Sequence, residues 1–308
     1  MNIIAPINNY DEIEILHQAG VNEFYGGYTP LFWRKKYSPW ISVNGRTFAE
    51  SNIDSLRNLH KIIEWCNDQN ITFNLTVNAP LYSEAQYPLI LKLIDEYINL
   101  GGKDLIVVDL GLILLLKEKK YPVCLHLGTG SSVLNHLSVG FYENIGIKRI
   151  ILDRQLSINE IKKILKNYPE IKFDVFMLVG QCPNIEGLCT FLHDSPDRNW
   201  HCIEKFKIEP IEIREKNECY NIWSNVKRTD ACGLCQVKKL LELKINGFKI
   251  VGRGASLDRR LKAVRGLKRM IDICSEPNIK ESKIKIQAQQ IYHEIFEHSC
   301  SEMICYFS

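Results

Sequence analysis

The hydrophobic pattern of the chain alternates between short β-branched runs and longer stretches with apolar residues at helical spacing. Such alternation is typical of βα units and of a parallel sheet. The runs predict eight strands, at Asn2–Ile7, Glu23–Gly26, Thr72–Val77, Asp104–Asp109, Val123–Leu127, Arg149–Asp153, Lys172–Leu178 and Phe248–Gly252. Several are almost wholly apolar, which is expected of strands that are buried on both faces.

Helical stretches separate these strands, and some carry recognisable end signals. Ser157 and Glu160 have the spacing of a capping box. The pattern predicts helices at Asp11–Ala19, Asp54–Trp65, Tyr87–Leu100, Ile161–Leu165 and Leu234–Ile245. Eight strand–helix units without a detectable linker predict an α/β chain that forms one TIM-like (β/α)₈ barrel over residues 1–276. A doubly wound open sheet is the alternative.

Two connections are unusually long, at residues 27–52 after the second strand and at residues 179–235 after the seventh. Loops of this length are normally functional or carry structure of their own. In a barrel both follow the C-terminal ends of strands, where active sites are built. We expect residues 277–308 to form a C-terminal tail with a short helix.

Composition narrows the class of protein. The chain has 308 residues, of which 45% are hydrophobic and 24% charged, and its net charge is +3. So mild a positive charge does not favour a DNA partner. The longest apolar runs, such as Leu110–Leu116, are shorter than the roughly 20 residues of a membrane span, and the N-terminus lacks the features of a secretory signal. We therefore expect a cytoplasmic protein with reduced thiols.

The chain contains 11 cysteines, and clustered cysteines in a reducing compartment favour a metal or redox site. Six lie in or near the seventh loop: Cys182, Cys189, Cys202, Cys219, Cys232 and Cys235. Four thiolates can enclose an iron–sulfur cluster, and a structural zinc ion is the alternative. Because Cys232 and Cys235 lie at a predicted helix start, we expect their pKa values to be depressed.

The remaining cysteines have simpler interpretations. Cys66, Cys124 and Cys274 lie in apolar patterns and are expected to be small buried residues. Cys300 and Cys305 either belong to a plain tail, which we favour, or form a second metal site with a member of the Cys232–Cys235 pair.

Four polar residues within or just after predicted strands are candidates for catalysis or binding. Asp109 is either a base at the barrel mouth or a helix cap. His126 is either a proton shuttle or a satisfied core group. Arg154 and Arg253 follow the sixth and eighth strands, and Arg253 is the first candidate for binding a carboxylate or phosphate.

Other polar residues extend this picture. Asn74 and Asn78 share one face of the third strand, which predicts a polar barrel lumen. Asn44 and Arg46 are candidates for binding an anionic or carbonyl group. A basic run is either a solvated helix face or an RNA-binding patch, and it comprises Arg259, Arg260, Lys262, Arg265, Lys268 and Arg269.

Several segments together resemble peptidase family U-32, the collagenase-like peptidase family. They are Ile4–Asn9, Ala19–Gly27, Asn74–Asn78, Leu105–Asp109, Ile147–Arg154, Cys182–Cys189 and Lys249–Arg253. The resemblance spans almost the whole chain and implies a TIM-like barrel with a [4Fe–4S] cluster held by four cysteines. It also implies a part in oxygen-independent hydroxylation of ubiquinone precursors or RNA, with a related partner subunit in a heterodimer.

Carried over residue by residue, the resemblance makes Cys182 and Cys189 the first two cluster ligands. Cys202 is then the third, at a shorter spacing than the family pattern. The fourth is Cys232 or Cys235. The longer RNA-directed members have an extra C-terminal domain that this sequence lacks, which favours a partner-dependent role over RNA modification.

The first functional hypothesis is therefore an iron–sulfur-dependent oxidoreductase, similar to a hydroxylase, that acts on a small molecule, a peptide or RNA. A peptidase is one alternative, although the sequence has neither a Gly-x-Ser-x-Gly elbow nor a His-Glu-x-x-His helix. A non-enzymatic binding subunit stiffened by its metal is the other.

Overall fold

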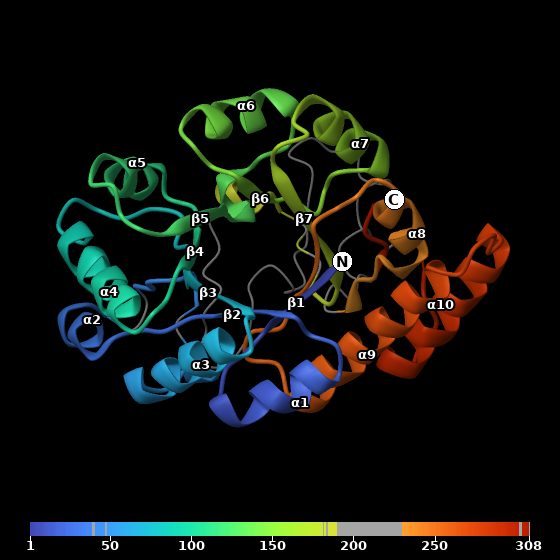
Figure 1. The fold of residues 1–308 in the computed structure, drawn as a ribbon, viewed down its shortest axis with the longest axis horizontal. Coiled ribbons are helices and arrows are strands. Elements are labelled where there is room, and N and C mark those ends of the chain that lie inside the picture. The colour runs from blue at the N-terminus through green and yellow to red at the C-terminus, as the bar shows by residue number, and fades with distance from the viewer. Residues whose placement is uncertain are drawn as a thin grey trace, which may run out of the picture.

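The computed structural model describes residues 1–38, 41–46, 48–180, 182, 184–189, 230–301 and 304–307. Eight parallel strands close into a barrel in sequence order (Figure 1). They are β1 (Asn2–Pro6), β2 (Glu23–Gly26), β3 (Thr72–Val77), β4 (Asp104–Val107), β5 (Cys124–Leu127), β6 (Arg149–Ile151), β7 (Lys172–Leu178) and β8 (Gly247–Ile250). The predicted TIM-like barrel is confirmed, and each predicted strand is present with small shifts at its ends.

Helices surround the barrel as an outer ring (Figure 1). They are α1 (Ile13–Gln18), α2 (Leu31–Lys36), α3 (Leu56–Asp68), α4 (Tyr87–Asn99), α5 (Leu110–Glu118), α6 (His136–Asn144), α7 (Ile158–Asn167), α8 (Val237–Glu242), α9 (Leu257–Cys274) and α10 (Glu281–Phe296). The predicted capping box is confirmed, because the Ser157 side chain accepts from the Glu160 amide and Glu160 bonds back to the Ser157 amide.

The two faces of the barrel strands differ in polarity. Residues such as Phe24, Leu75 and Val175 lie on the outer face and are fully or almost fully buried under the helices. The inner face carries polar groups, which confirms the predicted polar lumen. Arg149 Nη2 lies 2.7 Å from Glu23 Oε1, and Arg149 Nε lies 2.7 Å from Asp174 Oδ2. Buried charges are stable only when they are paired in this way.

The C-terminal segment is more ordered than a tail with a short helix. The 16 residues of α10 pack against α9, and residues beyond it return to the barrel. There the Cys232 amide donates to the Ile304 carbonyl at 3.0 Å, and the Tyr306 amide donates to the Cys232 carbonyl at 2.9 Å. Among the described helices, none has the length and apolar character needed to cross a membrane.

Candidate functional site

A cavity of about 550 Å³ lies within the C-terminal half of the barrel. Inward-facing side chains of six strands line its deeper part: Tyr25, Thr76, Ile106, Ile151, Phe176 and Lys249. Residues that follow the strands line its rim, and they include Arg46, Arg154, Glu186 and Arg253. Ligand sites of TIM-like barrels occupy this position, so the cavity is the candidate site.

Arg253 is fixed at the rim by hydrogen bonds to oxygen atoms. Its Nη2 donates to Asn44 Oδ1 at 2.6 Å, its Nη1 donates to Thr76 Oγ1 at 2.8 Å, and its Nε donates to the Ser51 carbonyl at 3.0 Å. Gly27 makes room for this network, because a Cβ atom there would lie 2.9 Å from Arg253 Nη2. The structure thus unites Arg253 and Asn44, two of the predicted anion-binding residues.

Arg154, the other arginine predicted for the site, pairs with Glu186 from the long seventh loop. Its guanidinium also lies 3.9 Å above the ring centroid of Phe176. Thr129 donates a further hydrogen bond to Glu186. Burial raises the pKa of Glu186, but the Arg154 charge and these hydrogen bonds outweigh burial and lower it to about 2. The carboxylate is therefore charged at neutral pH and orders the start of the loop.

Asp109 and His126 do not line the cavity. Asp109 is the N-cap of α5, where Oδ1 accepts from the Leu112 amide at 2.7 Å and from the Tyr87 hydroxyl at 3.0 Å. His126 Nε2 lies 3.1 Å from Asp104 Oδ1. The structure therefore shows Asp109 as a helix cap and His126 as a core residue with a partner, rather than as a base and a proton shuttle in the cavity.

Several lining residues escaped prediction, among them Tyr25, Lys249 and Glu186. Tyr25 and Lys249 occur in the segments that carry the family resemblance, yet neither was assigned a role, and Glu186 was not singled out. Lys249 offered the clearest signal, since it stands within the apolar run Phe248–Val251 and lysine is rarely buried without a partner. Glu186 had no such signal, because its role depends on Arg154, which lies 32 positions away in the sequence.

Cys182 and Cys189 lie beside this rim. Burial raises the pKa of Cys182 to about 11, with Glu186 raising it further, Arg154 opposing, and Cys189 close enough to contribute. The side-chain Nδ2 of Asn184 donates to Cys189 Sγ at 3.7 Å. Two thiols seven positions apart on a segment next to the cavity, with an amide donor aimed at one sulfur, are consistent with two ligands of an iron–sulfur cluster. Cys202 and Cys219 lie outside the described residues.

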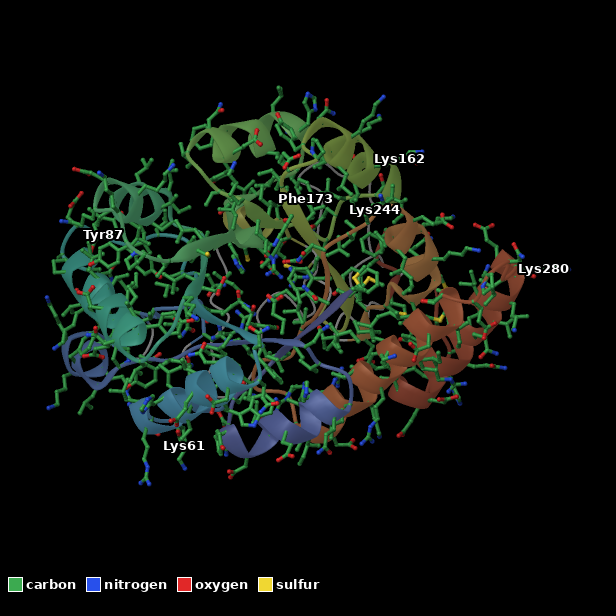
Figure 2. All side chains as sticks on the ribbon, viewed as in Figure 1. Lys61, Tyr87, Lys162, Phe173, Lys244 and Lys280 are labelled. Carbon is green, nitrogen blue, oxygen red and sulfur yellow. The ribbon has the colours of Figure 1, made fainter. Side chains whose placement is uncertain are left out.

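Cys232 and Cys235, at the end of the long loop, lie near the C-terminal segment instead. The backbones of Cys232 and Cys305 pair as an isolated parallel β-bridge, and the two thiols form no disulfide with each other. The other thiols that act on the pKa of Cys232 are those of Cys235, Cys305 and Cys300. Figure 2 draws the described side chains on the ribbon, with sulfur in yellow. The interpretation of Cys300 and Cys305 as a plain tail is therefore incomplete, because the fold brings both next to the Cys232–Cys235 pair.

Two expectations about thiols are wrong. The pKa values of Cys232 and Cys235 are raised rather than depressed, chiefly because burial disfavours the thiolate. The Leu234 amide does donate to Cys232 Sγ at 3.4 Å, which opposes this shift. Cys124 is exposed rather than buried, since it opens β5 at the N-terminal end of the barrel.

The described residues alone do not complete a metal site. Within them, no three histidine, cysteine, aspartate or glutamate side chains are arranged to hold a metal ion. A cluster bound through Cys182 and Cys189 would therefore take its remaining thiolates from the rest of the long loop or from a rearranged Cys232.

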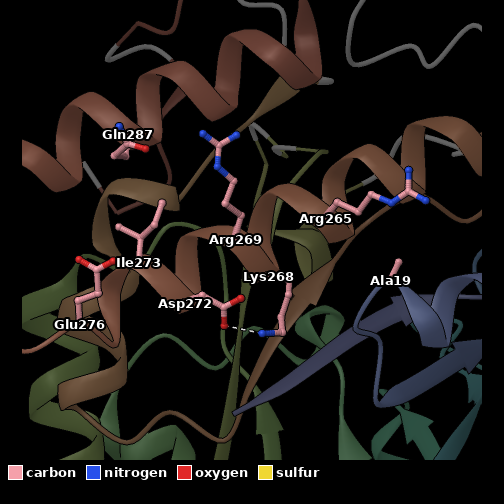
Figure 3. A pocket seen from close by; sticks show the side chains of 8 residues that line it. All are labelled: Ala19, Arg265, Lys268, Arg269, Asp272, Ile273, Glu276 and Gln287. Atoms are coloured by element: carbon pink, nitrogen blue, oxygen red, sulfur yellow. Dashed lines mark hydrogen bonds and ion pairs between the residues drawn. The ribbon is translucent and has the colours of Figure 1, made fainter.

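The basic run of α9 is neither a single solvated face nor a single basic patch. Arg260 is buried and pairs with Glu12 at 2.6 Å, and Arg259 lines the cavity. Arg265, Lys268 and Arg269 border an open hollow (Figure 3), where Lys268 pairs with Asp272. Arg269 also pairs with Glu294 of α10, and Lys262 pairs with Asp258. These acidic partners reduce the positive charge available to RNA.

Comparison with known proteins places the chain in context. The model of peptidase family U32 matches residues 8–307. The tRNA hydroxylation protein P of Haemophilus influenzae is 27% identical over 192 residues, which cover 61% of this chain and 37% of that protein. The protein of the same name from Escherichia coli K12 is 28% identical over 188 residues, or 61% of this chain and 38% of that protein. The matched region is less than half of either relative.

Two further similarities cover more of the chain. An uncharacterized protease of Methanocaldococcus jannaschii is 24% identical over 315 residues, which cover 96% of this chain and 72% of that protein. The structure of a U32 peptidase superposes with a TM-score of 0.52 at 11% identity, and the match covers 82% of this chain and 93% of that one. At so low an identity this likeness shows the fold alone.

Proposed function

Because this chain belongs to peptidase family U32, we propose that it is an iron–sulfur protein that takes part in an oxygen-independent hydroxylation or a related redox modification of RNA. The observation that carries the proposal is the position of Cys182 and Cys189 beside Arg154 and Glu186, at the rim of the barrel cavity. The relatives named for tRNA hydroxylation make transfer RNA the first substrate to test.

The proposed ligands are Cys182, Cys189, Cys202 and Cys232, with Cys235 as the alternative to Cys232. When bound, such a cluster supplies one-electron transfer at the cavity rim. The side-chain Nδ2 of Asn184 donates to Cys189 Sγ, and the Leu234 backbone N–H donates to Cys232 Sγ. Each donor stabilises the thiolate form that ligation requires, and at Cys232 it opposes the effect of burial. Zinc is the alternative occupant, and it would make the site structural.

The cavity residues have separate tasks in this proposal. Arg253 and Arg46 bind an anionic group of the reacting molecule, since Arg253 is held rigidly and Arg46 lines the same rim. The Arg154–Glu186 pair fixes the loop that carries Cys182 against the barrel. Ile106, Ile151 and Phe176 of the deeper lining offer the reacting molecule an apolar surface.

Peptide hydrolysis, the alternative, has less support from the site. A hydrolase of the serine or cysteine type needs a histidine beside its nucleophile. His126 is the histidine that lies on a barrel strand, and it is buried against Asp104 rather than exposed in the cavity. Among the described lining residues of the cavity there is no histidine or cysteine.

Deletion of the gene in its native host tests the proposal. Transfer RNA from cells grown without oxygen is digested to nucleosides and analysed by mass spectrometry. We expect a nucleoside with one additional oxygen to disappear, and to return with the wild-type gene but not with Cys182→Ser. Cys124→Ser is the matched control, because that thiol lies at the opposite end of the barrel. An unchanged nucleoside profile, together with casein hydrolysis by the purified protein, would contradict the proposal and favour a peptidase.

A further inference from the structure

The segment Cys182–Cys189 is held against the barrel by contacts with two neighbouring loops. Glu186 pairs with Arg154, which follows β6, and accepts a hydrogen bond from Thr129, which follows β5. Gly187 packs so closely on the loop after β5 that a Cβ atom there would overlap the backbone of that loop. These contacts fix the second half of the segment.

Gln155 holds the first half of the same segment. Its side-chain Nε2 donates to the Cys182 carbonyl at 3.0 Å and to the Asn184 carbonyl at 2.9 Å. One amide nitrogen thus binds two carbonyl groups that lie two positions apart. The Gln155 backbone N–H in turn donates to Asp153 Oδ1 at 3.1 Å. The cross-link therefore connects the segment to an anchored residue of the loop after β6.

The side chain of Asn184 is aimed at a sulfur atom. Its Nδ2 donates to Cys189 Sγ at 3.7 Å, while its carbonyl oxygen accepts the hydrogen bond from Gln155. A neutral thiol is a weak acceptor, whereas hydrogen bonds to an ionised acceptor are roughly twice as strong as those between neutral groups. The contact therefore suits a metal-bound thiolate better than a free thiol.

An N–H donor beside a ligand sulfur affects an iron–sulfur cluster in a defined direction. Reduction adds one negative charge to the cluster, and the donor stabilises that added charge. Hydrogen bonds to the sulfur atoms are among the features that set the reduction potential of such clusters. Residues that orient the ligands without binding the metal themselves have large effects in other metal sites. Asn184 has both properties with respect to Cys189.

We propose that Asn184 is a positioning residue of the cluster, which raises the reduction potential through its hydrogen bond to Cys189, and that Gln155 holds Asn184 in place. The inference rests on the proposed function, and it deepens that function by assigning residues that set the potential of its cluster. Neither side chain is a proposed ligand, so each can be replaced while all four thiolates remain.

Redox titration of the anaerobically purified protein tests the inference. Asn184→Ala removes the donor and should shift the reduction potential to a lower value, and Asn184→Asp should shift it further, because a carboxylate then faces Cys189 Sγ. Gln155→Glu keeps the shape of the side chain but loses its N–H donors, and we expect a smaller shift in the same direction. Asn167→Ala is the matched control, because Asn167 is exposed and donates to the Lys163 carbonyl on α7. It should keep the wild-type potential.

A second measurement covers the case in which the variants at position 184 take up no iron. Hydrogen–deuterium exchange of the metal-free protein should be several-fold faster in Gln155→Glu than in wild type for the peptide that contains Asn184, and unchanged in Asn167→Ala. Equal exchange in Gln155→Glu and wild type would overturn the inference, because Gln155 would then not hold Asn184.

Iron and sulfide are measured in each sample before the titration. A wild type that carries neither would contradict the proposed function itself. A loaded wild type whose potential is unchanged by Asn184→Ala and by Asn184→Asp would overturn this inference alone and leave the cluster in place.

Discussion

Arg149→Met removes the positive charge that holds the lumen together. The guanidinium lies 2.7 Å from both Glu23 and Asp174, and these acids are 3% and 1% exposed. Methionine retains part of the stem but leaves two buried carboxylates without their partner. Loss of one member of a buried ion pair costs about 3–5 kcal/mol, and two carboxylates are affected here, so we expect a loss of about 5 kcal/mol.

Urea unfolding followed by circular dichroism measures this loss. A cost of that size is a large part of the roughly 5–15 kcal/mol that stabilises a typical domain, so the midpoint should fall strongly while the slope is retained. Lys148→Met is the matched control, because Lys148 is exposed and adjacent, and we expect a change within about 0.5 kcal/mol. A loss below about 1 kcal/mol for Arg149→Met would refute the argument that this arginine neutralises the lumen.

Three further predictions concern Gly27, Asp109 and Glu186. Gly27→Ala places a Cβ atom 2.7 Å from both Asn44 Nδ2 and Asn52 Oδ1. We therefore expect the free energy of unfolding, measured by thermal unfolding, to fall by about 1–3 kcal/mol. An unchanged midpoint would contradict this expectation. Asp109→Ala should cost about 1 kcal/mol through loss of the cap and Asp109→Asn much less, and equal stabilities of the two variants would argue against capping. The pKa of Glu186 is lowered from 4.5 to about 2, so its contribution to stability is complete above pH 4.5 and is lost as the pH falls towards 2. Chemical unfolding of Glu186→Gln should therefore converge with wild type across that interval, and a difference independent of pH would exclude the ion pair as its cause.

Local pattern was sufficient to predict most of the barrel. Each strand is a short apolar run, and signals such as the Ser157 cap act within one helical turn, so both can be identified from neighbouring residues. The same locality explains why Asp109 was recognised as a possible cap. Arg253 and Arg154 were identified because the ends of barrel strands meet at one face whatever the loops contain.

Contacts between distant segments account for what was missed. The return of Cys305 to Cys232 depends on how α10 packs, which no local pattern encodes. The thiol pKa values were predicted wrongly because the position of Cys232 at a helix start was considered without its burial. Lys249 was overlooked as a candidate because its meaning depends on Arg149 occupying the nearby carboxylates.

The metal content of anaerobically purified protein tests the central claim most directly. Iron, acid-labile sulfide and zinc are measured for the wild type, for Cys182→Ser and for Cys305→Ser, whose thiol is not one of the proposed ligands. The account predicts about four irons and four sulfides per chain, lost in Cys182→Ser and retained in Cys305→Ser. Stoichiometric zinc, no metal, or iron that survives Cys182→Ser would contradict it.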